Sequence, residues 1–176
     1  MPSADNQQER LITIGWVTGF VDGEGCFSVS FIHQPHRISR KGYKLGVQVW
    51  CEFKVTQGEK SLSALKRLQG FFGAGSLYLN KRFDNHKEHL YNYSVRNSDE
   101  LNDLIIPFFQ VYPLQTAKRK DFEKFVQCFR LIQIKEHLTP EGLREIARIS
   151  STMNRQKDRL SIVERILNDH THGVLP

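Results

Sequence analysis

The chain begins with a segment in which two kinds of residue recur at helical spacing. Over residues 9–21, apolar side chains occupy every fourth position of one helix face. These apolar residues are Ile12, Trp16 and Phe20. A second face carries glycine at the same spacing, at Gly15, Gly19 and Gly23. Because each interior glycine costs a helix about 1 kcal/mol relative to alanine, the pattern predicts a helix whose glycine face packs closely against another helix.

The next segments alternate between apolar and polar residues, which is typical of half-buried strands. The first hairpin comprises strands from Cys26 to Gln34 and from Lys44 to Thr56, joined by a basic turn over 33–42. Its inward-facing residues are predicted to be Phe27, Val29, Phe31, Leu45, Val47, Val49, Cys51, Phe53 and Val55. A second hairpin follows, with strands at about Ser76–Arg82 and His89–Val95. An amphipathic helix from Ser61 to Phe72, stopped by Gly73, separates the two hairpins.

Further helices complete the chain. Ser98 is predicted to cap a helix that Pro107 closes, and Thr116 to begin a longer one. Thr139, followed by proline and glutamate, predicts the start of another helix. A short last helix is expected over 161–168.

This order of elements predicts an α+β fold with a four-stranded antiparallel sheet. Helices are expected to cover one face of the sheet, and the other face would carry polar side chains of the kind that bind a groove. We expect one domain over 1–176, with a core at about 9–135 and a helical extension at about 138–170.

Composition narrows the class of partner. The 176-residue chain has a net charge of +6 and a pI near 9.3, which favours a polyanionic partner. The absence of a long apolar run predicts no membrane association, and the three widely spaced cysteines predict reduced packing residues in an intracellular protein. The closely spaced histidines are not accompanied by the cysteine pairs of common zinc sites, so no zinc site is predicted. Glycine-rich nucleotide-binding motifs do not occur in the sequence, so nucleotide hydrolysis is not predicted either.

Residues 17–25, Val-Thr-Gly-Phe-Val-Asp-Gly-Glu-Gly, resemble the LAGLIDADG motif of homing endonucleases. The departures are Thr18 and Gly23 in place of alanine, and Glu24 in place of the final aspartate. The resemblance covers about 12–132. It implies an α-β-β-α-β-β-α core with a curved sheet and extra C-terminal helices. It also implies a homodimer, because the chain carries one copy of a motif that works in pairs.

The resemblance implies that paired motif helices bring two acids together to bind a divalent metal. The expected ligands of Mg²⁺ or Mn²⁺ are the Glu24 carboxylate and the Gly23 carbonyl, which are hard oxygen donors. The motif residues expected at the helix interface are Gly15, Thr18, Gly19 and Asp22. Asp22 is interpreted as an acid that stabilises the helix end. The alternative is that both acids belong to a solvated helix end, which would be the usual explanation of such a triplet outside this motif.

Three further residues acquire expected catalytic roles from the same resemblance. Gln57, at the end of the second strand, would order water around the scissile phosphate. The family's basic residue near this position is replaced by Ser61, which leaves the neighbouring Lys60 as a substitute. Lys118 matches the register of an active-site lysine and would stabilise charge in the transition state. The alternative is that Lys118 belongs to a solvated basic cluster at a helix start.

Double-stranded DNA is the expected partner, contacted in the major groove by outward strand residues and by the basic turn. The strand candidates are Ser28, Ser30, Ile32, Gln34, Gln48, Trp50, Glu52, Lys54, Tyr78, Asn80, Arg82, Asn92 and Ser94, and the turn candidates are Arg37 and Arg40. Two subunits would cover roughly 20 base pairs about a pseudo-two-fold axis.

The expected function is metal-dependent, sequence-specific double-strand cleavage by an intron-encoded endonuclease. The resemblance places such proteins in bacterial or archaeal cytoplasm, or in a mitochondrion or chloroplast. Two alternatives remain open: a non-cleaving maturase or DNA-binding regulator of the same fold, and a basic protein that dimerises and packs on RNA.

Overall fold

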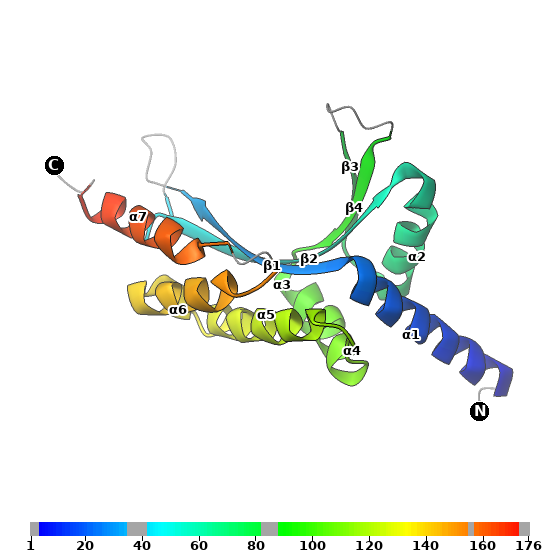
Figure 1. The fold of residues 1–176 in the computed structure, drawn as a ribbon. Helices are drawn as coiled ribbons and strands as arrows, with labels where there is room; N and C mark the ends of the chain where they lie inside the picture. Colours follow the sequence, from blue (N-terminus) through cyan, green and yellow to red (C-terminus); the bar gives the residue numbers. More distant parts are fainter. Residues whose placement is uncertain (1–3, 35–41, 82–87, 155–156, 173–176) are drawn as a thin grey trace. The chain divides into compact units, whose positions relative to one another are not determined.

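The computed structural model describes residues 4–34, 42–81, 88–154 and 157–172 (Figure 1). In chain order the elements are α1 (Ala4–Glu24), β1 (Gly25–His33), β2 (Val47–Gly58), the 3-10 turn η1 (Glu59–Ser61), α2 (Leu62–Phe72), β3 (Ser76–Asn80), β4 (Leu90–Val95), α3 (Ser98–Glu100), the π-helical η2 (Leu101–Ile105), α4 (Ile106–Val111), α5 (Lys118–Gln133), the 3-10 turn η3 (Glu136–Leu138), α6 (Pro140–Ser151) and α7 (Arg159–His172). The strands form one sheet in the order β1-β2-β4-β3. The predicted fold is therefore confirmed, with four strands and both hairpins in place.

Contacts divide the chain into two compact units that share β2. One unit comprises residues 1–26 and 52–119, and the other comprises residues 27–51 and 120–176. The C-terminal helices α6 and α7 are thus part of a unit that also contains most of β1 and the first part of β2.

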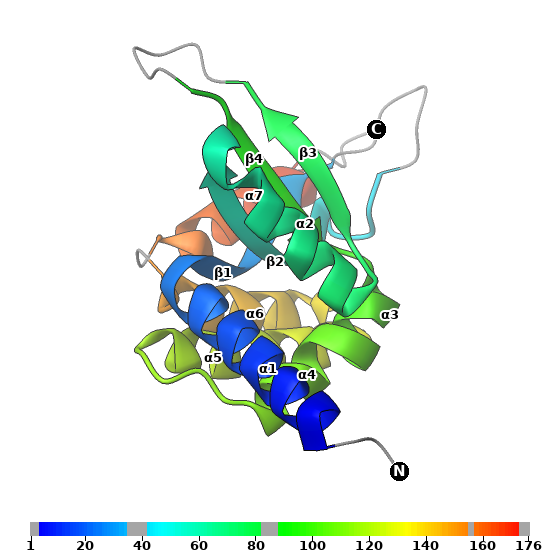
Figure 2. The ribbon, with the colours of Figure 1, turned by 90° about the vertical axis from the view of Figure 1, so that its right-hand side faces the viewer.

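In the first unit, α2 packs on the hairpin formed by β3 and β4 (Figure 2). Phe53 of β2 lies opposite Val95 of β4, and both are fully buried. The Phe53 ring contacts Phe72 of α2 at 6.2 Å and Phe109 of α4 at 5.8 Å between ring centroids. The alternation predicted for these strands is explained by this aromatic core. As predicted, α2 stops at Gly73, which adopts a left-handed φ of 63°.

The helix predicted between Ser98 and Pro107 differs from the prediction at both ends. Asn97, not Ser98, is the N-cap, because its side chain accepts hydrogen bonds from the amides of Asp99 and Glu100. Pro107 does not close the helix. It lies in the first turn of α4, after a π-helical turn, where its missing N–H needs no partner.

In the second unit, β1 and the first part of β2 pack against helices. Phe27 of β1 contacts Phe122 of α5 at 5.0 Å between ring centroids. A second cluster joins β2 to the C-terminal helices, and its buried members are Val47, Leu143, Ala147, Val163, Ile166 and Leu167. The predicted helix start at 139 is confirmed, since the Thr139 side chain accepts a hydrogen bond from Gly142 N.

Asn154 and Arg159, the first residue of α7, cover part of the free edge of β1. Asn154 Nδ2 donates to the Phe27 carbonyl at 2.9 Å, and Arg159 Nε donates to the Val29 carbonyl at 3.1 Å. Because an uncovered strand edge invites pairing with other chains, these two side chains protect β1.

No disulfide joins the cysteines. Burial raises the pKa of the Cys128 thiol to about 12. Within the described residues, no helix has both the length and the apolar character needed to cross a membrane.

Candidate active site

The glycine face of α1 is open. A Cβ atom built on Gly15, Gly19 or Gly23 would meet nothing within 4 Å. Leu11, one helical turn before Gly15, is 65% exposed. The Thr18 hydroxyl donates a hydrogen bond to the Ile14 carbonyl of the same helix at 2.9 Å, so this donor needs no hydrogen-bond acceptor on a second helix. This face therefore offers apolar and backbone surface to a second helix.

At the end of α1, Asp22 anchors the segment that leads into α5. Its carboxylate accepts hydrogen bonds from Gln115 N at 2.8 Å and from the Thr116 hydroxyl at 2.6 Å. Burial acts to raise the pKa of Asp22, but the hydrogen bonds from Thr116 and Gln115 and the charge of Lys118 outweigh it and lower the pKa. The contacts of Asp22 are with the segment that leads into α5, so it fixes the approach to that helix; its predicted role at the end of α1 stays a prediction.

The anchored segment delivers Lys118 to the end of α1. Lys118 Nζ donates to the Val21 carbonyl at 3.0 Å and to the Gly23 carbonyl at 3.1 Å. The last carbonyls of a helix have no partner within the helix and carry partial negative charge, which attracts a cation. The fold therefore brings Lys118 beside the Gly23 carbonyl, while the Glu24 carboxylate stays exposed.

Gln57 and Lys60 lie near the end of β2. Gln57 is half-buried and pairs with Tyr91 of β4, and Lys60 is exposed in η1. Among the residues that the structure describes, no hydrogen bond or ion pair joins either side chain to Glu24.

The predicted DNA-contacting residues differ in exposure. Tyr78 and Asn80 are exposed, and a further set is half-buried: Ser28, Ser30, Ile32, Gln34, Gln48, Trp50 and Lys54. Glu52, Asn92 and Ser94 are buried. Arg37, Arg40 and Arg82 lie outside the described residues.

The three buried residues have partners within the sheet. Asn92 accepts a hydrogen bond from the Thr56 hydroxyl at 2.6 Å. Glu52 accepts from the Ser94 hydroxyl at 2.7 Å and from Arg96 Nε at 2.8 Å. These contacts hold the polar side of the sheet in a defined arrangement, which the alternation of residue types alone does not reveal.

Arg96, which contacts Glu52 on this side of the sheet, was not among the predicted DNA-contacting residues. It continues the alternation of Asn92 and Ser94 by one step, just beyond the end of β4. Extending that alternation past the predicted strand end at Val95 would have found it.

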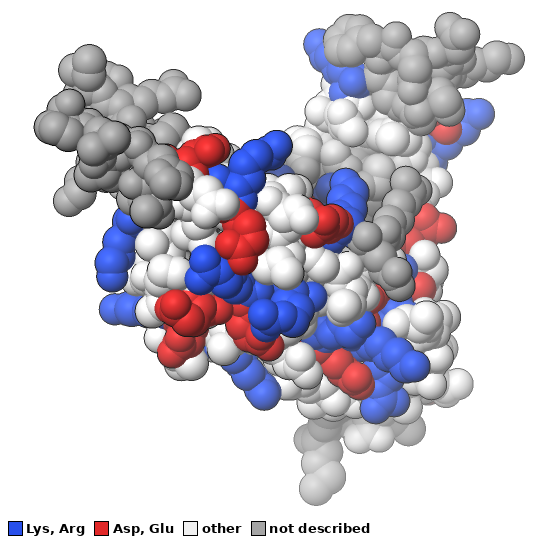
Figure 3. Space-filling model, turned by 60° about the vertical axis from the view of Figure 1, so that its left-hand side comes forward, with Lys and Arg blue, Asp and Glu red and all other residues white. Residues whose placement is uncertain are grey.

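On the face in Figure 3, acidic and basic side chains intermingle. Ion pairs of this kind occur on α6 and α7, where Arg144 Nε lies 2.8 Å from a Glu164 oxygen.

The donor set at the end of α1 fits a hard divalent cation. The Glu24 carboxylate is exposed, and the Gly23 carbonyl accepts a hydrogen bond from Lys118 Nζ; both are oxygen donors of the type that Mg²⁺ and Ca²⁺ prefer. Within the described part of the chain, no cluster of three His, Cys, Asp or Glu side chains forms a complete metal site. One chain therefore offers two of the oxygens that such an ion needs.

Comparisons with known proteins agree with the motif at 17–25. The family model described as LAGLIDADG endonuclease matches residues 17–129. The chain is 37% identical over 141 residues to "Probable intron-encoded endonuclease 3" of Neurospora crassa, covering 79% of this chain and 24% of that protein. The chain thus spans about a quarter of this curated relative.

Two solved structures extend the similarity to the fold. The crystal structure of the homing endonuclease I-TnaI matches with a TM-score of 0.71 and 34% identity, covering 89% of this chain and 97% of that one. A structure of I-SmaMI, bound to an uncleaved DNA target in the presence of calcium ions, matches with a TM-score of 0.70 and 32% identity. That match covers 87% of this chain and 48% of the I-SmaMI chain.

Proposed function

The chain belongs to the LAGLIDADG endonuclease family, and on that premise we propose that it is an intron-encoded homing endonuclease. In this proposal two copies of the chain make a double-strand break in a long pseudo-palindromic DNA site. The reaction is divalent-metal-dependent phosphodiester hydrolysis.

The end of α1 carries this proposal. An exposed carboxylate at Glu24, a glycine face with open space, and a lysine ammonium at the Gly23 carbonyl occur together on one helix end. A second copy of α1 packed on the glycine face would bring two Glu24 side chains close to the pair's axis. Two such acids supply what two strand cleavages require.

In the proposed site, Glu24 and the Gly23 carbonyl would hold Mg²⁺ or Mn²⁺. When bound, the metal would lower the pKa of a water molecule and neutralise charge on the departing oxygen. The remaining ligands would come from the second copy, from DNA phosphate and from water, because the described residues form no cluster of three His, Cys, Asp or Glu side chains.

The neighbouring residues would position and stabilise the reacting groups. Lys118 lies next to the Gly23 carbonyl, so its ammonium is within reach of charge that develops on a phosphate bound there. Gln57 would hold the attacking water through its amide. Lys60, exposed just after β2, would contact the phosphate backbone.

The proposed DNA surface is the polar side of the sheet. The I-SmaMI structure was solved with DNA, which supports double-stranded DNA as the partner of this chain. The exposed and half-buried polar residues of the strands would contact base edges, together with Arg37, Arg40 and Arg82. Buried Asn92 and Glu52 are better suited to orienting their neighbours than to touching bases.

A cleavage-site selection tests the function. The purified chain is incubated with Mg²⁺ and a randomised DNA library, and the cut ends are sequenced. Discrete, near-palindromic cut sites are expected. Sequence-specific binding without cutting in any divalent metal would contradict the endonuclease proposal and favour a maturase or regulator.

A matched pair of variants tests the mechanism on the selected site. Glu24→Gln removes the charged ligand with little change of shape, so it should bind DNA and fail to cut. Glu9→Gln makes the same change at an exposed position earlier in α1 and should cut normally. Cutting by Glu24→Gln at the normal rate would overturn the role given to Glu24.

A further inference from the structure

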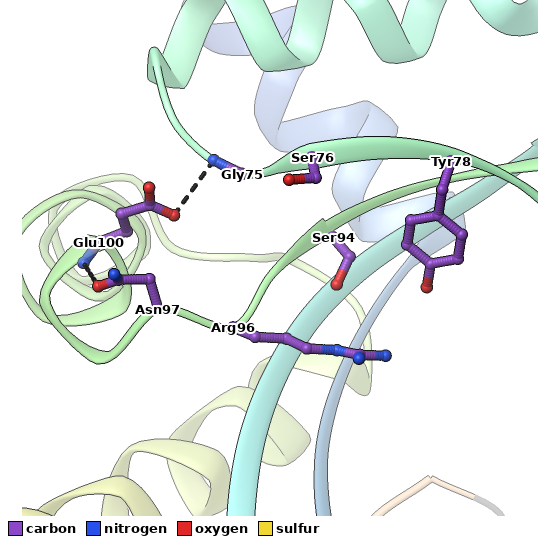
Figure 4. Close-up of a pocket in the computed structure, with 7 residues that line it drawn as sticks. All are labelled: Gly75, Ser76, Tyr78, Ser94, Arg96, Asn97 and Glu100. Atoms are coloured by element: carbon purple, nitrogen blue, oxygen red, sulfur yellow. Dashed lines mark hydrogen bonds between the residues drawn. The ribbon is translucent and has the colours of Figure 1, made fainter.

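Beside the buried acid of β2 lies a pocket of about 360 Å³, within the unit that contains α2, β3 and β4. Its lining residues, all labelled in Figure 4, are Gly75, Ser76, Tyr78, Ser94, Arg96, Asn97 and Glu100. Figure 4 shows the Arg96 side chain extending along the side of the pocket toward which the Ser94 and Tyr78 hydroxyls point.

The Arg96 guanidinium donates a hydrogen bond to the Glu52 carboxylate. Extending the β2–β4 register by one pair places Glu52 opposite Arg96. Glu52 is only 7% exposed and accepts hydrogen bonds from Arg96 and Ser94. A buried carboxylate is costly unless it is paired, so this arrangement is one that the fold maintains. The Arg96 side chain nevertheless remains 46% exposed.

The far wall of the pocket is also fixed. Gly75 N donates to the Glu100 carboxylate at 3.2 Å, and the Asn97 side chain accepts from Glu100 N at 3.2 Å. Gly75 has a φ of 75°, and a Cβ atom there would lie 2.7 Å from the Ser94 carbonyl. Only glycine fits this close approach of β3 to β4, and the approach brings the pocket walls together.

We propose that Arg96, oriented by Glu52 across the β2–β4 pair, recognises a guanine base in the major groove of the DNA target. Arginine donates two hydrogen bonds to the O6 and N7 atoms of guanine. These acceptors carry no net charge, so the pairing depends on how the guanidinium is oriented. Glu52 lies between two cations, with Arg96 Nε 2.8 Å from one carboxylate oxygen and Lys54 Nζ 3.7 Å from the other, and its charge offsets part of theirs. This inference rests on the proposed function, because it assumes that the polar side of the sheet faces DNA.

The test measures base preference by binding, in Ca²⁺, to a library that carries single changes from the selected site. Arg96→Lys keeps the charge and loses the planar fork of donors. It should lose a guanine preference of about 5- to 150-fold at one position of each half-site, with other positions unchanged. Arg148→Lys on α6 is the matched control, since Arg148 is 61% exposed and pairs with Glu145.

Glu52→Gln provides an independent variant. It should weaken the preference at the same guanine position and at no other, because Arg96 loses its charged anchor. If Arg96→Lys keeps the wild-type guanine preference at every position of the half-site, the proposal is overturned. Uniform weakening with a shallower salt dependence of binding also overturns it, because that result is the behaviour of a phosphate contact.

The outcome separates this inference from the proposed function. If the wild-type chain cuts its site and the Arg96→Lys variant shows the same base preferences, the proposed function stands and the inference is refuted. A wild-type chain that selects no DNA sequence refutes both.

Discussion

Replacing Gly19 by alanine should affect the fold and the dimer in opposite directions. A Cβ atom at Gly19 meets nothing within 4 Å in the single chain, so the methyl group causes no clash there. Alanine favours a helix over glycine by about 1 kcal/mol, so the free energy of unfolding of the single chain should rise by about that amount.

The same methyl group should weaken association of two chains through the glycine face. Each copy adds one methyl group to a close helix contact, and overpacking costs about 1–3 kcal/mol per site. Two sites therefore raise the dimer dissociation constant by about 30-fold or more. Analytical ultracentrifugation measures this constant. Urea unfolding at protein concentrations below the dissociation constant measures the free energy of unfolding of the single chain, because association then does not contribute to stability.

Gly70→Ala is the control for this prediction. Gly70 is also helical, and a Cβ atom there meets nothing within 4 Å, but it lies on α2. It should raise the free energy of unfolding by a similar amount and leave association unchanged. An unchanged dissociation constant in Gly19→Ala would show that the glycine face is not the dimer contact.

Three further predictions concern stability and reactivity. Because the pKa of Asp22 is lowered in the folded chain, its stabilising effect is present above the ordinary value of 3.8 and is lost as the pH falls through the folded pKa. Urea unfolding of Asp22→Asn should therefore show a smaller loss of stability on acidification than the wild type, and an identical pH profile would contradict this. Thr139→Ala removes the cap of α6 and should lower the free energy of unfolding by about 1 kcal/mol, whereas no change would mean that the cap contributes nothing. Because burial raises the pKa of Cys51 and Cys128, both thiols should resist iodoacetamide at about pH 8 and react only in urea, as mass spectrometry can show; rapid native modification would refute this.

Local patterns determined most of the secondary structure. The alternation along β1 and β2, the glycine after α2 and the Thr139 cap each depend on near neighbours, and each was predicted from the sequence. The errors at Asn97 and Pro107 are local too. Pro107 does not end the helix because the chain continues through a π-helical turn into α4. At the other end, asparagine and serine are both favoured N-cap residues, so adjacent candidates could not be separated.

The motif at 17–25 determined the family and the candidate acid at Glu24, because glycines at helical spacing followed by acidic residues can be recognised within one short segment. Tertiary structure alone decided what surrounds that acid. Asp22 anchors a segment more than ninety residues away, and this anchor brings Lys118 to the Gly23 carbonyl. In the same way, polar residues of β2 and β4 that look equivalent in sequence divide into half-buried ones, such as Gln48 and Lys54, and the buried Glu52, Asn92 and Ser94. Whether a polar side chain meets solvent or a partner depends on which strand lies beside it, and strand pairing is a property of the folded chain.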